Sequence, residues 1–96
     1  MKTFFDGIFI SKNLLEEAGI KYPIKLEYFK TLNENVESKF GIEVVKTEYL
    51  EGNVNIETKE ITNIAGDEQK QEEILSLLRN NQVTPITLEE VLEEIM

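Results

Sequence analysis

The clearest pattern in this chain is an alternation of apolar and polar residues in its middle part. The segment 24–32 opens with apolar residues at every second position and charged residues between them. This period of two is typical of a strand that buries one face of a sheet. A second β-rich run occupies 40–50, and a short turn at 51–53 leads into a third alternating run that starts at Val54. Because the loop between these two runs is short, we expect antiparallel pairing, and the three strands form a predicted meander.

Two shorter elements are expected nearer the N-terminus. Residues 4–10 are mostly apolar and predict either a short strand or two strand fragments around Gly7, whose partner the sequence does not identify. Ser11 is a favourable helix cap and Gly19 a favourable helix stop, so the pattern predicts a short helix over 12–18.

The last third of the chain changes to helical spacing. Apolar residues recur three and four positions apart between Asp67, a favourable N-cap, and the Asn80-Asn81 pair. This spacing predicts a helix of about three turns. Pro85 prevents that helix from simply continuing, so a separate helix is expected after it.

The last helix has the most complete set of local signals in the chain. Thr87 and Glu90 have the spacing of a capping box, and Ile86 and Val91 stand at the positions of a hydrophobic staple. The apolar stripe of this helix comprises Leu88, Val91, Leu92 and Ile95. Its other faces carry the four glutamates Glu89, Glu90, Glu93 and Glu94. We expect the stripe to pack on the sheet as core, and docking into a groove of another chain or of a second copy is the alternative.

These elements predict one compact α+β domain over residues 1–96. Its small, mainly antiparallel sheet consists of the three-strand meander, with or without the N-terminal strand, and two or three helices cover it. A 96-residue chain with 41% hydrophobic residues is long enough for one core and too short for two. No apolar run approaches the roughly 20 residues that cross a bilayer, and Asp6 interrupts the N-terminal run. We therefore expect a cytoplasmic protein that does not contact membranes.

Composition narrows the classes of function. Cys and His are absent, which removes disulfides, thiolate metal sites and the usual base that activates a nucleophilic serine. Ser11, Ser38 and Ser76 are better explained as a helix cap, a turn residue and an exposed helix residue. The scattered glycines form no phosphate-binding loop. We expect a protein without enzymatic activity, cofactor or metal site.

The charge distribution points towards protein partners. Residues 1–40 carry six acidic and six basic residues, whereas 41–96 carry thirteen acidic and only four basic ones. The second part therefore accounts for the net charge of −9, which disfavours contact with phosphate backbones and favours a basic protein surface. One basic and aromatic set would otherwise suit single-stranded nucleic acid. It comprises Lys21, Lys25, Lys30, Tyr22, Tyr28 and Phe29. Alternation separates these residues onto different faces, so we expect no direct binding of nucleic acid.

The four glutamates of the last helix are the candidate partner-binding residues. Glu89 with Glu93 and Glu90 with Glu94 are each four positions apart, where like charges cost a few tenths of a kcal/mol. Three explanations are open: a solvated helix face, a face that binds a partner, or a divalent-metal or catalytic site. Negative charge is favourable near a helix N-terminus and unfavourable near its C-terminus. Glu93 and Glu94 are therefore the stronger functional candidates.

Residues 40–96 also resemble a known family. The segments FGIEVVKTEYLEGNVNIETKEI and LLRNNQVTPITLEEVLEEI resemble an uncharacterised family of short proteins from Gram-positive bacteria, classified only as a domain of unknown function. The most specific element is NNQVTPITLEEVLEE, a Val-Thr-Pro step followed by an acidic helix. The resemblance implies a compact bacterial domain and supplies no active site.

A second resemblance concerns the N-terminal part. The segment DGIFISKNLLEEAGI resembles the strand and helix pattern of swapped-hairpin transcription regulators and antitoxins. That family usually has proline at the position of Ser11 and an arginine between the residues corresponding to Gly7 and Ile8. Both departures weaken the expectation of DNA binding, because they remove a basic contact to phosphate.

The sequence thus favours a non-enzymatic regulator or inhibitor that binds a basic surface on a partner protein. Masking of a nucleic-acid-binding channel, as phage-encoded inhibitors of host defence do, is one concrete form. The alternatives are a structural or assembly module that forms a homodimer through outward helices, and an antitoxin-like regulator.

Overall fold

The computed structural model describes residues 2–10, 22–32 and 40–95, which form an α+β arrangement of one sheet and two helices. The strands are β1 (Lys2–Ile10), β2 (Ile24–Leu32), β3 (Phe40–Leu50) and β4 (Asn53–Ala65). The helices are α2 (Glu68–Asn80) and α3 (Leu88–Ile95). The helix predicted over 12–18 lies outside the described residues.

The sheet is a continuous antiparallel meander in the order β1-β2-β3-β4. The strand bounds predicted for 24–32 and 40–50 are confirmed, and the expected three-strand meander is one part of a four-stranded sheet. β1 supplies the additional strand, and its partner is β2. The turn between β3 and β4 contains Gly52 at a φ of 75°, a left-handed conformation that glycine adopts at little cost.

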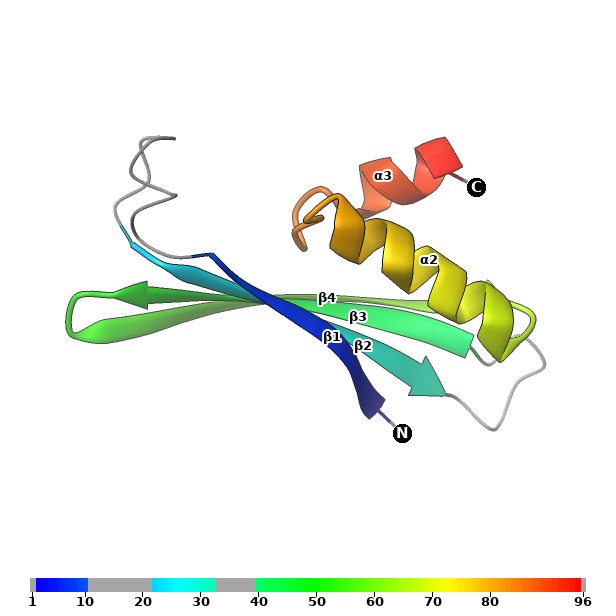
Figure 1. Cartoon of the computed structure of the whole chain (residues 1–96), viewed down its shortest axis with the longest axis horizontal. Coiled ribbons are helices and arrows are strands. Elements are labelled where there is room, and N and C mark those ends of the chain that lie inside the picture. The colour runs from blue at the N-terminus through cyan, green and yellow to red at the C-terminus, as the bar shows by residue number, and fades with distance from the viewer. Residues whose placement is uncertain (1, 11–21, 33–39, 96) are drawn as a thin grey trace.

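The two faces of the sheet have different surroundings. Both helices lie on one side of the sheet (Figure 1), and α2 contacts all four strands. Tyr28 on β2 is cross-strand partner to Val44 on β3, and both are fully buried on this helix-covered face. Residues of the opposite parity, such as Phe29, lie on the other face, which we name the open face because neither described helix covers it.

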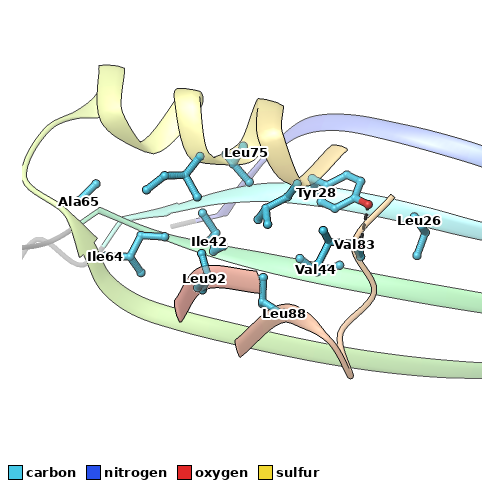
Figure 2. Close-up of a cluster of buried hydrophobic side chains, with 12 residues drawn as sticks. Leu26, Tyr28, Ile42, Val44, Ile64, Ala65, Leu75, Val83, Leu88 and Leu92 are labelled. Atoms are coloured by element: carbon cyan, nitrogen blue, oxygen red, sulfur yellow. Dashed lines mark hydrogen bonds between the residues drawn. The ribbon is translucent and has the colours of Figure 1, made fainter. Parts of the chain in front are cut away.

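The core lies between the helix-covered face and the helices. Its members are Leu26, Tyr28, Ile42, Val44, Ile64, Ala65, Ile74, Leu75, Leu78, Val83, Leu88 and Leu92. Figure 2 shows Leu75 of α2 and Leu92 of α3 in the same cluster as Ile42 of β3. The alternation in β2 and the helical spacing in α2 therefore converge on one hydrophobic layer, as the sequence predicts.

The end of α2 directs the chain back into this core. Gln82 has a positive φ of 51°, and the Val83 N–H donates to the Leu78 carbonyl at 3.0 Å. This arrangement is the usual way in which a left-handed residue ends a helix. Val83 is thereby buried, and its carbonyl accepts a 2.8 Å hydrogen bond from the Tyr28 hydroxyl. The polar end of a fully buried tyrosine is satisfied by the connection between the two helices.

The start of α2 is fixed by two polar side chains. Asp67 caps the helix as predicted, because its Oδ1 accepts a 2.8 Å hydrogen bond from the Lys70 N–H. One turn later the buried Gln71 Nε2 donates to the carbonyls of Thr31 at 3.0 Å and Gly41 at 2.6 Å. Gln71 therefore joins α2 to the facing ends of β2 and β3 at a place where water has little access.

The start of α3 differs in detail from the sequence-based expectation. Within the described chain, the Thr87 hydroxyl contacts Thr84, at 3.1 Å from the Thr84 hydroxyl, and accepts no bond from the Glu90 N–H. Ile86, expected to form a staple with Val91, is 75% exposed. The helix is present where predicted, but a Thr84–Thr87 turn precedes it, and the burial of Leu88 and Leu92 rather than a staple anchors it.

Replacing Gln71 by leucine should lower the free energy of unfolding by about 2 to 3 kcal/mol, because two buried carbonyls lose their donor. Urea denaturation measures the change. The matched control is Gln69→Leu at an exposed position of the same helix, where a change within about 0.5 kcal/mol is expected. Equal effects of the two substitutions would contradict the proposed link between α2 and the sheet.

Stability should also depend on pH through Tyr28. Burial raises the pKa of its hydroxyl from 10.0 to about 12, although Arg79 acts in the opposite direction. Between these two pH values the folded state retains a proton that the unfolded state has lost, so the free energy of unfolding falls as pH rises. The free energy of unfolding should fall by about 2 to 3 kcal/mol across this pH window.

Urea denaturation between pH 9 and 12 tests this dependence on the native chain and on Tyr28→Phe. The variant should lose less stability than the native chain over the window. Tyr22→Phe, at an exposed position, is the control and should behave like the native chain. Parallel curves for all three proteins would rule out a buried, protonated Tyr28.

Candidate functional site

The side chains of α3 that face the sheet hold the helix in place. Leu88 and Leu92 are buried in the core, and Val91 is partly buried against it. These three residues of the apolar stripe are thus core, as expected, which argues against a free docking stripe. Because they face inward, Glu90, Glu93 and Glu94 lie on the exposed side of the helix.

The four candidate glutamates do not have equivalent surroundings. Glu89 Oε1 forms a 2.8 Å ion pair with Lys59 Nζ, which ties α3 to the edge strand β4. Glu90, Glu93 and Glu94 are exposed, and no ion pair within the described part of the chain involves them. The structure therefore separates one carboxylate with a structural contact from three that are available.

The carboxylates of α2 are largely engaged in the fold. Lys30 Nζ on β2 contacts Glu68 Oε2 at 2.8 Å and Glu72 Oε2 at 2.7 Å. The hydrogen bonds that Lys30 donates to Glu68 and then to Glu72 raise its pKa. Glu73 lies 4.0 Å from Lys70 on the same helix, with both side chains well exposed, a pair that contributes little to stability. The free carboxylates of the helices are therefore concentrated on α3.

Together the two helices and their connection form a strongly acidic layer. We name residues 67–95 the helix layer; they include eight acidic and two basic residues, so this layer holds −6 of the net charge of −9. The asymmetry that the sequence assigns to everything after residue 40 thus belongs mainly to one side of the molecule. A surface of this kind attracts and orients cationic partners.

A shallow cleft extends the acidic surface from α3 to β4. It has a volume of about 350 Å³ and is lined by Glu57, Thr58, Lys59, Pro85, Ile86 and Glu89. The Glu57 Oε2 atom is buried and has no hydrogen-bond partner. Of the two carboxylates in the cleft, Glu89 is paired with Lys59, so the Glu57 Oε2 atom beside exposed Ile86 is the group suited to the head of a cationic side chain.

Other chemistry considered from the sequence finds less support in the arrangement of side chains. Within the described residues, no three acidic side chains lie close enough together to hold a metal ion. Ser76 is exposed on α2, whereas Ser11 and Ser38 lie outside the described residues. No helix in the described ranges is long and apolar enough to cross a membrane.

The basic and aromatic set is divided between the two faces, as the alternation predicts. Tyr28 and Lys30 lie on the helix-covered face, where the first is in the core and the second binds α2. Lys25 and Phe29 lie on the open face. Lys21 is not among the described residues. The described members therefore do not form one nucleic-acid surface.

Two features of the site could not be read from the sequence. Alternation places Glu57 and Lys59 on the same face of β4, but nothing in the sequence shows that Pro85 and Glu89 lie beside them in the cleft. Likewise, Arg79 near the end of α2 forms a 3.0 Å ion pair with Asp6 on β1, 73 residues away. Such contacts depend on how α2 crosses the sheet, which periodicity alone does not determine.

Changing Glu93 and Glu94 together to glutamine should raise the free energy of unfolding by about 0.5 to 1 kcal/mol, because two negative charges leave the C-terminal end of a helix. The matched variant Glu89→Gln with Glu90→Gln removes two charges at the favourable end and one ion pair, and it should destabilise slightly. Urea denaturation at low salt compares them. The opposite order of stability would show that Glu93 and Glu94 have stabilising contacts, and would weaken their candidacy as binding residues.

Comparison with known proteins agrees with the resemblance drawn from the sequence. The pattern of DUF6514, a family of unknown function, matches residues 7–96. The match reaches from the middle of β1 to the end of the chain, farther than the resemblance over 40–96. No curated protein and no solved structure is significantly similar to the chain. The chain belongs to the DUF6514 family of unknown function.

Proposed function

We propose that this protein is a non-enzymatic regulator or inhibitor that binds a basic surface on a partner protein through α3. Glu90, Glu93 and Glu94 are the contact residues, and Glu89 lies at the border of the site because Lys59 holds it. The observation that supports the proposal is a helix fixed by buried leucines that presents three carboxylates without ion-pair partners in the described chain. A cytoplasmic location and a Gram-positive bacterial source belong to the same proposal.

The rigidity of α3 favours binding. Its backbone is ordered by the core before any partner arrives, so association orders only the glutamate side chains, at a cost of about 0.5 to 1.5 kcal/mol each. Glu90 and Glu94 are one helical turn apart, about 6 Å between their Cβ atoms. Arginine side chains on a partner can meet carboxylates at this spacing with two hydrogen bonds each.

The chemistry of the partner follows from the sign and concentration of charge. A helix layer with a net charge of −6 speeds association with cationic surfaces and disfavours acidic ones. Proteins that bind nucleic acids present such cationic surfaces, with several lysines or arginines in line. Masking such a surface would inhibit the partner without any chemical reaction, which agrees with a site made of free carboxylates.

The alternatives are weaker on specific grounds. An assembly module that associates through outward helices would need a broad apolar surface on those helices, but the outward positions of α3 are glutamates, and Leu77 is the large apolar side chain that the described part of α2 exposes. The antitoxin-like alternative is weakened by the departures from that family at Ser11 and between Gly7 and Ile8, which remove a basic contact to phosphate.

Changing Glu93 and Glu94 to glutamine should reduce capture of the partner from a cell lysate by roughly tenfold at low salt, because two charge pairs are lost. The effect should shrink at high salt because screening has already weakened those pairs. The native chain and the variant, each immobilised in the same amount, are compared by quantitative mass spectrometry of bound proteins.

The matched control is Glu48→Gln with Glu51→Gln, which removes the same charge from positions outside the helix layer and off the open face. This control should retain the basic partner. Equal loss with both variants would indicate a general charge effect and contradict a site on α3, and full retention by both would remove α3 from the interface.

A further inference from the structure

The open face of the sheet carries large apolar side chains that no described helix covers. Phe4 and Phe9 on β1 are 55% and 61% exposed, and Val54 and Ile56 on β4 are 50% and 60% exposed. The register places all four on the open face, because their cross-strand partners share the parity of Phe29. Contiguous apolar surface of this kind on a sheet marks a binding surface more often than isolated exposed residues do.

These side chains form two groups along the sheet. Near the β3–β4 turn, Phe9 and Tyr49 have ring centroids 6.2 Å apart, and Tyr49 is the direct cross-strand partner of Val54. Ile56 lies opposite Thr47, which is buried although it lies on the open face. The group therefore spans the sheet from one edge strand to the other.

The second group lies at the other end of β1. Phe4 and Phe29 meet edge to face, with their ring centroids 5.7 Å apart, and Lys2 Nζ lies 4.5 Å from the centre of the Phe29 ring. The Phe4 ring also lies close to the backbone of Gly7, where an added Cβ atom would be 3.3 Å from the ring and 3.3 Å from the Leu26 carbonyl oxygen.

The charges of this face differ from those of the helix layer. On the open face, basic and acidic side chains form ion pairs. Lys2 lies 3.2 Å from Glu43, and Lys25 lies 3.5 Å from Glu27. A hydrogen bond with Tyr49, followed by attraction to Glu27, raises the pKa of Lys25. With Glu60 included, the face has three acidic residues and two basic ones by register. A nearly neutral face can approach a copy of itself, which a strongly acidic layer cannot.

The size of the face suits a stable interface. Four strands of at least nine residues cover roughly 600 Å² in projection, and side chains increase the accessible area. A standard interface buries about 800 Å² on each partner. The radius of gyration of 14.3 Å also exceeds the value of about 12.5 Å for a compact domain of this length. The chain measures 43 × 26 × 18 Å, and both described helices lie on one side of its sheet, which leaves the other side without a described helix (Figure 1).

We propose that the open face packs against the open face of a second copy, forming a sandwich of two sheets with the helix layers outside. Sheets in such sandwiches lie about 10 Å apart, and each helix layer adds about 10 Å. The two acidic layers are then about 30 Å apart, several times the screening length of about 8 Å at physiological salt. This geometry buries the nearly neutral faces and keeps the like charges apart, which favours a second copy over association through the helices.

Sedimentation velocity over a range of concentrations tests the proposal. The native chain should be a dimer, and the double variant Val54→Lys with Ile56→Lys should raise the dimer dissociation constant by about 100-fold or more. Phe4→Lys with Phe9→Lys, on the opposite edge strand, should have a similar effect. These side chains are at least half exposed, and circular dichroism confirms that each variant is folded.

The matched control is Leu77→Lys with Ile86→Lys, which places two lysines at exposed apolar positions in the helix layer. It should remain a dimer, and added salt should not dissociate the native dimer, because screening reduces the repulsion between the helix layers. A native monomer at all concentrations would overturn the proposal. So would dissociation by the helix-layer variant, or dissociation by the β4 variant alone, which would indicate pairing of β4 edges instead.

Discussion

The burial of one face of the sheet under α2 determines which surfaces of this protein are available to others. Tyr28, Ile42 and Val44 are completely buried there, together with Leu75 and Leu78 of the helix. Because side chains alternate along each strand, the commitment of one set to the core leaves the other set on the open face. The same packing turns α3 so that its leucines face inward and its free glutamates face outward. Both proposed binding surfaces are therefore consequences of one packing arrangement.

Polar contacts specify how the helices sit on the sheet and also decide which charges remain free. Gln71 holds the start of α2 to β2 and β3, and the Tyr28 hydroxyl holds the connection after its end. Lys30 binds two carboxylates of α2, and Lys59 binds Glu89 of α3. Carboxylates used in this way are positioned by the fold, whereas Glu90, Glu93 and Glu94 form no ion pair within the described structure. Carboxylates that form no ion pair within a fold are available to a binding partner.

Local signals in the sequence predict the elements well and their mutual placement poorly. The alternation in β2 and the Asp67 cap of α2 are local properties, and both are confirmed. β1 pairs with β2, whose residues lie about twenty positions farther along the chain, and the register shifts between Phe4 and Asp6. No local sequence pattern reveals this pairing or this shift. The staple expected at Ile86 is wrong because the Thr84–Thr87 turn and the burial of Leu88 position α3 instead. Sequence alone also treated four glutamates as equivalent, since the ion pair of Glu89 with a strand 30 residues away depends on tertiary packing.

The most direct test of one-sided burial is a nuclear Overhauser experiment on a sample with labelled methyl groups. The structure predicts cross-peaks from the methyl groups of Leu75 and Leu92 to those of Ile42 and Val44, which share their core cluster. No cross-peaks are expected from these leucines to Val45 or Ile56, which lie on the open face. Cross-peaks from either leucine to Val45 or Ile56 would place the helices on the other face of the sheet and contradict the account of both surfaces.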